Sequence, residues 1–136
     1  MKKFSVLAAF LFVVMISSTA FAANWVKVFS DEDEDTYVDT NSARRGIYSD
    51  RLGIYRSDGF TVNVRHIYAD DSDTAIWVIG FFTENGKRAY INYLDVLDEN
   101  GNSLLVDHSR RDYSVDYIFD GTPLSAVYDY VENHLL

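Results

Sequence analysis

The sequence predicts an α+β fold, mostly β, in which a curved antiparallel sheet of about five to seven strands carries one C-terminal helix packed on it. Two patterns lead to this class. After residue 22, apolar and polar side chains alternate with a period of two in several segments, as in half-buried strands. At the end of the chain, Leu124, Val127, Tyr128, Val131 and Leu135 follow the spacing of an amphipathic helix.

Residues 1–22 have the pattern of a cleavable secretory signal peptide. Lys2 and Lys3 form its positive start, residues 4–16 an apolar stretch, and Ala20-Phe21-Ala22 a small-residue box after which we place the cut. The stretch is too short to span a hydrocarbon core of about 30 Å, so we expect no transmembrane segment. Without any cysteine to carry a lipid, the protein is expected to be exported to the periplasm, cell surface or medium and not to be a lipoprotein.

The remaining residues, 23–136, have the size of a single domain. Loss of Lys2 and Lys3 leaves 10 of the 12 basic residues against 21 acidic ones, a formal charge of −11. Such a charge repels nucleic-acid phosphates, so we expect no nucleic-acid partner. With no disulfide available, stability has to come from burial, for which aromatic side chains are plentiful.

The first half of the domain is expected to hold several short strands and one longer one. Short strands are predicted at 25–29, at 37–39 and within 47–56, separated by the acidic run 31–35 and by a turn at 42–46. Alternation over 60–68 predicts a half-buried strand.

A hairpin, a further strand and the helix follow. Residues 75–82 are apolar throughout, which predicts a central strand covered on both faces. The Asn85-Gly86 pair predicts a tight turn to a partner strand at 88–96, and turn residues at 98–102 lead to a strand at 103–107. Alternation resumes at 113–119, and Thr122 and Pro123 mark the start of the helix as its cap and first residue.

The acidic run that begins at Asp31 and ends at Asp35 raises the question of a calcium site. Consecutive carboxylates suit a hard cation, but a calcium loop starting at Asp31 lacks the glycine and the closing acid at the required spacing. A solvated hairpin loop is the favoured interpretation, and specific calcium binding stays open. The Asp98-x-Asn100-x-Asn102 segment also lacks the glycine and the closing acid of a calcium loop, and it is better explained as a β-turn.

The sequence carries no recognisable catalytic or metal motif. The three histidines, His66, His108 and His134, share no zinc-binding spacing, and no serine has the signature of a nucleophile elbow. We therefore expect no catalytic residue, no metal ligand, no cofactor and no enzymatic activity.

Three basic doublets in this acidic chain each have a tyrosine nearby. Arginine pairs well with carboxylate or sulfate groups, so these residues are candidates for contact with a partner. The alternative, which the weakness of surface ion pairs favours, is that they balance local acids such as Asp50, Glu84 and Asp112. The candidate partner-binding residues are Arg44, Arg45, Tyr48, Lys87, Arg88, Tyr90, Arg110, Arg111 and Tyr113.

Short motifs make the chain resemble the surface-adhesin protein E-like family of small exported bacterial proteins. The motifs are Trp25-Val26-Lys27-Val28, Thr36-Tyr37-Val38-Asp39-Thr40-Asn41-Ser42, and Thr122-Pro123-Leu124-Ser125 followed by Tyr128 and Val131. The resemblance spans nearly all of 23–136 and implies a curved antiparallel sheet with a C-terminal helix and a role in adhesion to host matrix proteins. The cysteines of many members are missing, and Tyr55 stands where a Trp is common. No binding residue of the family lies in a motif that matches this sequence residue by residue, so none is transferred.

Two function classes follow. The first is an exported binding module, adhesin-like, in the cell envelope or secreted, which holds a protein or host-matrix partner through sheet-edge backbone and exposed Tyr and Arg side chains. The second is a periplasmic carrier or accessory protein for a small haem-like ligand between sheet and helix, with His66 or His108 as the iron ligand. The sequence specifies neither the partner nor the oligomeric state.

Overall fold

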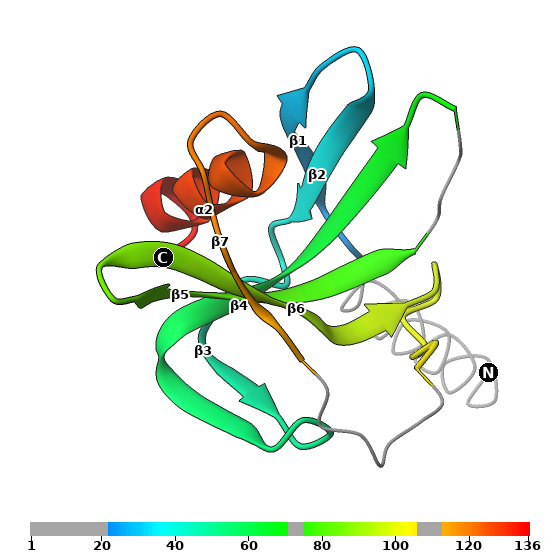
Figure 1. The fold of residues 1–136 in the computed structure, drawn as a ribbon. Coiled ribbons are helices and arrows are strands. Elements are labelled where there is room, and N and C mark those ends of the chain that lie inside the picture. The colour runs from blue at the N-terminus through cyan, green and yellow to red at the C-terminus, as the bar shows by residue number, and fades with distance from the viewer. Residues whose placement is uncertain (1–21, 71–74, 106–112) are drawn as a thin grey trace, which may run out of the picture.

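The computed structural model describes residues 22–70, 75–105 and 113–136 (Figure 1). These residues form seven strands and one helix, which confirms the predicted class, a mostly β fold with a C-terminal helix. The elements are β1 (Trp25–Ser30), β2 (Glu34–Asp39), β3 (Arg44–Ser49), β4 (Ile54–Tyr68), β5 (Ile76–Glu84), β6 (Lys87–Leu97), β7 (Val115–Tyr117) and α2 (Pro123–His134). The predicted signal peptide lies almost wholly outside the described residues, as do His108, Arg110 and Arg111.

The strands belong to one antiparallel sheet with the order β1-β2-β4-β5-β6-β7, and β3 pairs with β4 beside this path. The 15-residue strand β4 allows this arrangement because two strands share one of its edges. Its first half pairs with β3, with Tyr55 opposite Tyr48, and its second half pairs with β2, with His66 opposite Thr36. The sheet curves along β4, and Figure 1 shows β3 and the β1–β2 hairpin at opposite ends of it.

The sheet has a core on each face. On one face, α2 covers a core formed by Val38, Phe60, Val62, Val64, Ile79, Phe81, Val127 and Val131. On the other face, β3 and the turn after it cover a second core formed by Ile47, Leu52, Ile54, Val78, Phe82, Ala89, Ile91 and Leu94. Consecutive residues of β5, such as Val78 and Ile79, belong to opposite cores. This arrangement confirms the prediction of a central strand buried on both faces.

Helix α2 begins where the sequence predicts. Thr122 has an extended backbone, and its side-chain oxygen accepts a hydrogen bond from the backbone N–H of Ser125 at 3.3 Å. Pro123 follows in the first turn, where a missing N–H donor costs nothing. In the described parts of the chain, no helix has the length and apolar character needed to cross a membrane.

Three local predictions differ from the structure. Ser103 forms an isolated bridge to Leu97 where a strand is predicted over 103–107, and the end of that range lies outside the described residues. The predicted turn at 42–46 ends early, because β3 starts at Arg44 and a bulge accommodates Gly46 inside the strand. The predicted strand at 113–119 is reduced to β7, and Phe119 lies beyond its end with 74% of its surface exposed.

Candidate functional site

The first basic doublet lies on β3. Arg44, Arg45 and Tyr48 all have exposed side chains. Arg44 and Tyr48 line a hollow of about 440 Å³ whose other walls include Asp95 and Ser103. Since the lining of this hollow mixes arginines with aspartates, it presents no single sign of charge to a partner.

The second basic doublet, Lys87 and Arg88, lies at the start of β6. Arg88 donates to the carboxylates of Asp120 and Asp129, the latter at 2.9 Å, and so ties β6 to α2 and to the loop before it. The Lys87 ammonium lies 5.4 Å from the centroid of the Tyr117 ring. Arg88 therefore balances local acids, although not the ones expected from the sequence.

The remaining candidates do not complete a single surface. Arg110 and Arg111 lie outside the described residues, and Tyr113, which follows them, is about half exposed. Tyr90 packs against the helix-side core and lines a different hollow from Arg44. Burial, followed by the nearby charge of Asp116, raises the pKa of the Tyr90 hydroxyl. The described candidates are thus spread over at least two separate hollows.

The acidic run is divided between a turn and a strand. The Asp31 carboxylate accepts hydrogen bonds at 2.8 Å from the backbone N–H groups two and three residues further on, which closes the β1–β2 turn. Asp35 lies in β2, where the Ser30 hydroxyl at 2.5 Å and then the Lys27 ammonium at 3.5 Å hold the pKa of its carboxyl below the usual value. Within the described ranges, no three acidic or histidine side chains are placed to hold a metal ion together.

His66 on β4 and Glu34 on β2 form a largely buried hydrogen-bonded pair. His66 Nδ1 lies 2.7 Å from Glu34 Oε2, and the two side chains are 14% and 17% exposed. The buried Thr36 hydroxyl lies 3.0 Å from the same Nδ1 and 3.3 Å from the Glu34 carboxylate. When Nδ1–H donates to this carboxylate, Nε2 is the ring nitrogen that remains for a ligand.

Two hollows meet at His66, and we call them together the His66 groove. The first hollow, of about 250 Å³, has a lining that includes Glu34, His66, Tyr90, Tyr117, Phe119 and Leu124. The second hollow, of about 240 Å³, has a lining that consists of His66, Tyr68, Trp77, Ile79, Asn92, Tyr93 and Leu124. His66 and Leu124 line both hollows. The groove is therefore rich in aromatic rings, with the His66–Glu34 pair at its centre and the start of α2 along its side.

A bulge in β6 forms the outer wall of the groove. Residues 92–94 of β6 lie opposite the single residue Ile79 of β5. Tyr93, in the middle of the bulge, has a φ of +60°, which few aromatic residues adopt, and its ring meets Trp77 edge to face at 4.9 Å. Arg51 donates hydrogen bonds to the carbonyl of Tyr93 and, at 3.3 Å, to that of the next residue. The Arg51 guanidinium thereby supports the conformation that presents the Tyr93 ring.

Sequence reasoning found only part of this groove. It named His66 as a candidate ligand but did not identify Glu34, because 32 residues separate the two and only the pairing of β2 with β4 joins them. It also does not identify Trp77 and Tyr93 as groove residues, because they lie within the strands predicted at 75–82 and 88–96. Asn92 is the one local sign of the bulge, since Asn is disfavoured inside strands and tolerates irregular backbone.

The fold and the groove define a class of protein, namely a single curved antiparallel sheet with one covering helix and an aromatic groove beside the start of that helix. Comparisons with family models, with curated proteins and with solved structures found no match. The resemblance to the surface-adhesin protein E-like family therefore rests on the short motifs given above and stays a prediction.

Proposed function

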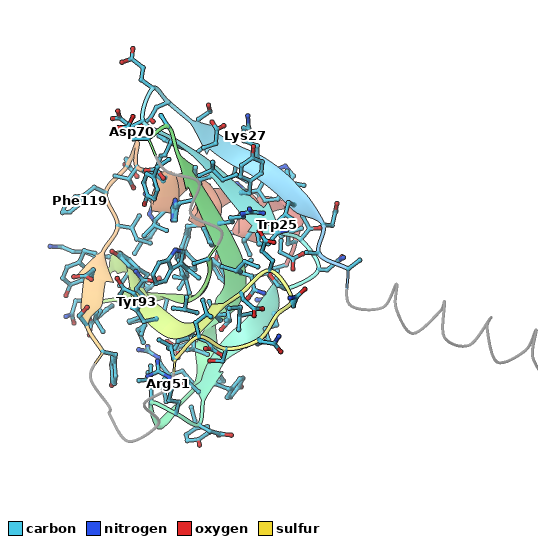
Figure 2. The ribbon with its side chains drawn as sticks, turned by 90° about the vertical axis from the view of Figure 1, so that its right-hand side faces the viewer. Trp25, Lys27, Arg51, Asp70, Tyr93 and Phe119 are labelled. Atoms are coloured by element: carbon cyan, nitrogen blue, oxygen red, sulfur yellow. The ribbon has the colours of Figure 1, made fainter. Side chains whose placement is uncertain are left out.

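We propose that this protein is an exported, adhesin-like binding module that holds a protein partner in the His66 groove. The observation that carries this proposal is a set of exposed aromatic rings around one groove. Tyr68, Tyr93 and Phe119 expose 45%, 51% and 74% of their surface. Figure 2 shows Phe119 projecting outward from the segment between β7 and α2. Such rings dominate the binding free energy of many protein interfaces, because each buries a large area with few rotatable bonds.

The backbone that carries these rings is fixed by hydrogen bonds and regular secondary structure, which also favours binding. Tyr68 ends the long strand β4, and Arg51 supports the bulge that carries Tyr93. The carbonyl of Phe119 accepts a hydrogen bond from the hydroxyl of Thr122 at 2.7 Å, just before the capped start of α2. A surface that is already ordered loses little conformational entropy when a partner binds.

Export is the second part of the proposal, and the signal-peptide pattern of residues 1–22 supports it. Its test is fractionation of the producing bacterium with an antibody against the mature protein. Detection on intact cells or in the medium, with Ala23 as the first residue, is the expected result. Confinement to the periplasm would exclude a host-matrix partner, and retention in the cytoplasm with residues 1–22 attached would contradict export.

A binding assay tests the groove itself. Purified host-matrix proteins are immobilised and incubated with the mature protein and three variants. Phe119→Ala and Tyr93→Asn should each weaken binding about tenfold or more, since each removes a central ring. Tyr55→Ala is the matched control, because Tyr55 is 65% exposed but lines neither hollow of the groove. Similar losses in all three variants, or a loss in none, would argue against the groove as the binding site.

One observation favours a second candidate function, carriage of a small haem-like ligand. His66 lies in an aromatic groove between sheet and helix, and Glu34 bonds its Nδ1 as carboxylates do for many metal-ligating histidines. In this function His66 would bind the iron and the surrounding rings would contact the macrocycle. His108, the other candidate iron ligand, lies outside the described residues.

Absorbance spectroscopy with haemin separates the two functions. A Soret shift that saturates, is lost in His66→Ala and is retained in His134→Ala would support the carrier. His134 is a suitable control because it is exposed at the end of α2, where its Nδ1 lies 3.1 Å from the carbonyl of Tyr130. An unchanged haemin spectrum, or a Soret shift that is retained in His66→Ala, would contradict haem binding by His66 in the groove.

A further inference from the structure

Three aromatic rings line the second hollow of the His66 groove, which we call the outer hollow. Trp77 and Tyr93 meet at an interplanar angle of 85°, and Tyr68 stacks on His66 with ring centroids 6.1 Å apart. Tyr68 and Tyr93 are each about half exposed. The face of an aromatic ring carries negative partial charge and attracts an ammonium or guanidinium group.

The charges around this hollow have the complementary sign. No lysine or arginine is among the described residues that line the two hollows of the groove, whereas Glu34 lies at its centre. Glu34 and Tyr68 also line a neighbouring hollow whose walls include Asp31 and Asp35. Figure 2 shows Asp70 at the same end of the molecule as the β1–β2 hairpin. A cationic group in the outer hollow would therefore meet aromatic rings, with carboxylates in the adjoining hollows.

His66 adds a hydrogen-bond acceptor to this environment. In the neutral tautomer whose Nδ1–H donates to Glu34, Nε2 has a lone pair for an N–H donor. The side-chain oxygen of Asn92, which also lines the outer hollow, accepts from the backbone N–H of Tyr93 at 3.0 Å and has a second lone pair for a ligand donor. A donor-rich cationic group can bond to both acceptors, while a purely apolar group offers them no donor.

We infer that the hollow bounded by Tyr68, Trp77 and Tyr93 takes the cationic end of a lysine or arginine side chain from the protein partner. This inference rests on the proposed binding function and narrows it to partners that present a basic segment. The formal net charge, −9 for the full sequence and −11 after loss of Lys2 and Lys3, favours the approach of such a segment over long distances. This chemistry differs from that of the candidate arginine residues named from the sequence, which would suit acidic partners.

Two peptides that differ in one charged group test the inference. The probes are Ac-Gly-Ser-Lys-Ser-Gly-NH2 and its analogue with norleucine in place of lysine. Each is titrated into the ¹⁵N-labelled mature protein while backbone amide and indole NMR signals are recorded. The lysine peptide should shift the Trp77 indole signal and the amides of residues 66–68 and 92–94 until they saturate. The norleucine peptide should bind about tenfold more weakly or not at all.

Two variants and a control connect the shifts to the rings. Tyr93→Asn removes one ring and keeps a residue that tolerates the left-handed backbone. Tyr68→Leu removes another ring without touching the bulge. Each should weaken binding of the lysine peptide about three- to tenfold. Tyr55→Asn, on the first half of β4, should leave the affinity unchanged.

Three results would overturn the inference. Equal shifts from both peptides would mean that the site recognises apolar groups. Shifts confined to residues 31–35 would mean non-specific attraction between charges. The absence of shifts would mean that the groove does not bind a lysine side chain. In each case the binding assay with immobilised matrix proteins shows whether only the inference about lysine or arginine fails, or the proposed binding function fails as well. Partner binding that still depends on Phe119 and Tyr93 would keep the groove as a binding site with a different ligand chemistry.

Discussion

Gly59 shows how a single residue sets the path of strand β4. Its φ is +87°, and a Cβ at this position would lie 2.1 Å from the backbone oxygen of Phe81. The absence of a side chain lets β4 approach β5 where the pairing of the two strands begins, with Phe60 opposite Phe81. This close approach brings the two phenylalanines into the helix-side core, where their rings stack at 5.1 Å.

Gly59→Ala should therefore lower the free energy of unfolding by about 2–4 kcal/mol, because the new methyl group meets backbone in a strained conformation. Gly86→Ala is the matched control, since Gly86 also has a positive φ but open space around it. Its cost should be about 1 kcal/mol. Denaturant unfolding of the two variants measures the difference, and equal losses would contradict the close approach described for Gly59.

The carboxyl group of Asp98 is expected to make a pH-dependent contribution to the stability of the fold. The backbone N–H of Asn102 and then that of Asn100, both at 2.9 Å, hold the pKa of its carboxyl below the usual value. A folded-state pKa below the unfolded one stabilises the fold above the unfolded pKa, and the stabilisation is lost as the pH falls through the folded pKa.

Asp98→Ala should thus lower the melting temperature at pH 7, and its difference from the unmodified protein should shrink as the pH falls below about 4. Thermal melts between pH 7 and pH 2.5 measure this. Glu132→Gln, at an exposed residue of α2, is the control and should keep the pH dependence of the unmodified protein. A constant difference at every pH would mean that Asp98 acts through something other than its charge.

At the scale of elements, strong local patterns predicted the structure well. The Asn85-Gly86 turn has the positive φ values, 50° and 76°, that its residues suggested, and it joins β5 to β6 as expected. The helix starts at Pro123 after its Thr122 cap. In both cases the backbone conformation depends on a few adjacent residues, and this is why the sequence sufficed.

Features that depend on distant pairing could not be predicted. The bulge around Tyr93 needs the register between β5 and β6 and the support of Arg51, which is 42 residues away. The His66–Glu34 pair needs β4 to be long enough to pair with both β2 and β3. The groove is built by these two features, so the candidate site was largely invisible in the sequence although the fold class was not.

The cap of α2 carries a prediction at this scale. Thr122→Ala removes the hydrogen bond to the Ser125 N–H and the one to the Phe119 carbonyl, and it should cost about 1 kcal/mol. The substitution should also make the backbone at Phe119 less ordered and thereby weaken partner binding. Ser114→Ala, which removes a hydroxyl bonded only at the surface, is the control for stability. Unfolding free energies that are equal for the two variants would contradict the role of the cap.

For the whole molecule, the two cores on opposite faces of one sheet predict a single cooperative unit. Ile47→Ala, in the core under β3, and Ile79→Ala, in the core under α2, should each cost about 2–5 kcal/mol. Each variant should unfold in one transition that is the same by far-UV and near-UV circular dichroism. Early loss of the helix signal in Ile79→Ala alone would show instead that the two faces unfold separately.

The central claim for the whole molecule is that it is exported and holds a protein partner in the His66 groove. Photo-crosslinking in the producing bacterium tests it most directly, with p-benzoylphenylalanine at position 93 in the groove or at position 55 outside it. A discrete adduct from position 93 in the envelope or medium, and none from position 55, is the predicted result. No adduct from position 93, the same adducts from both positions, or adducts found only in the cytoplasm would contradict the claim.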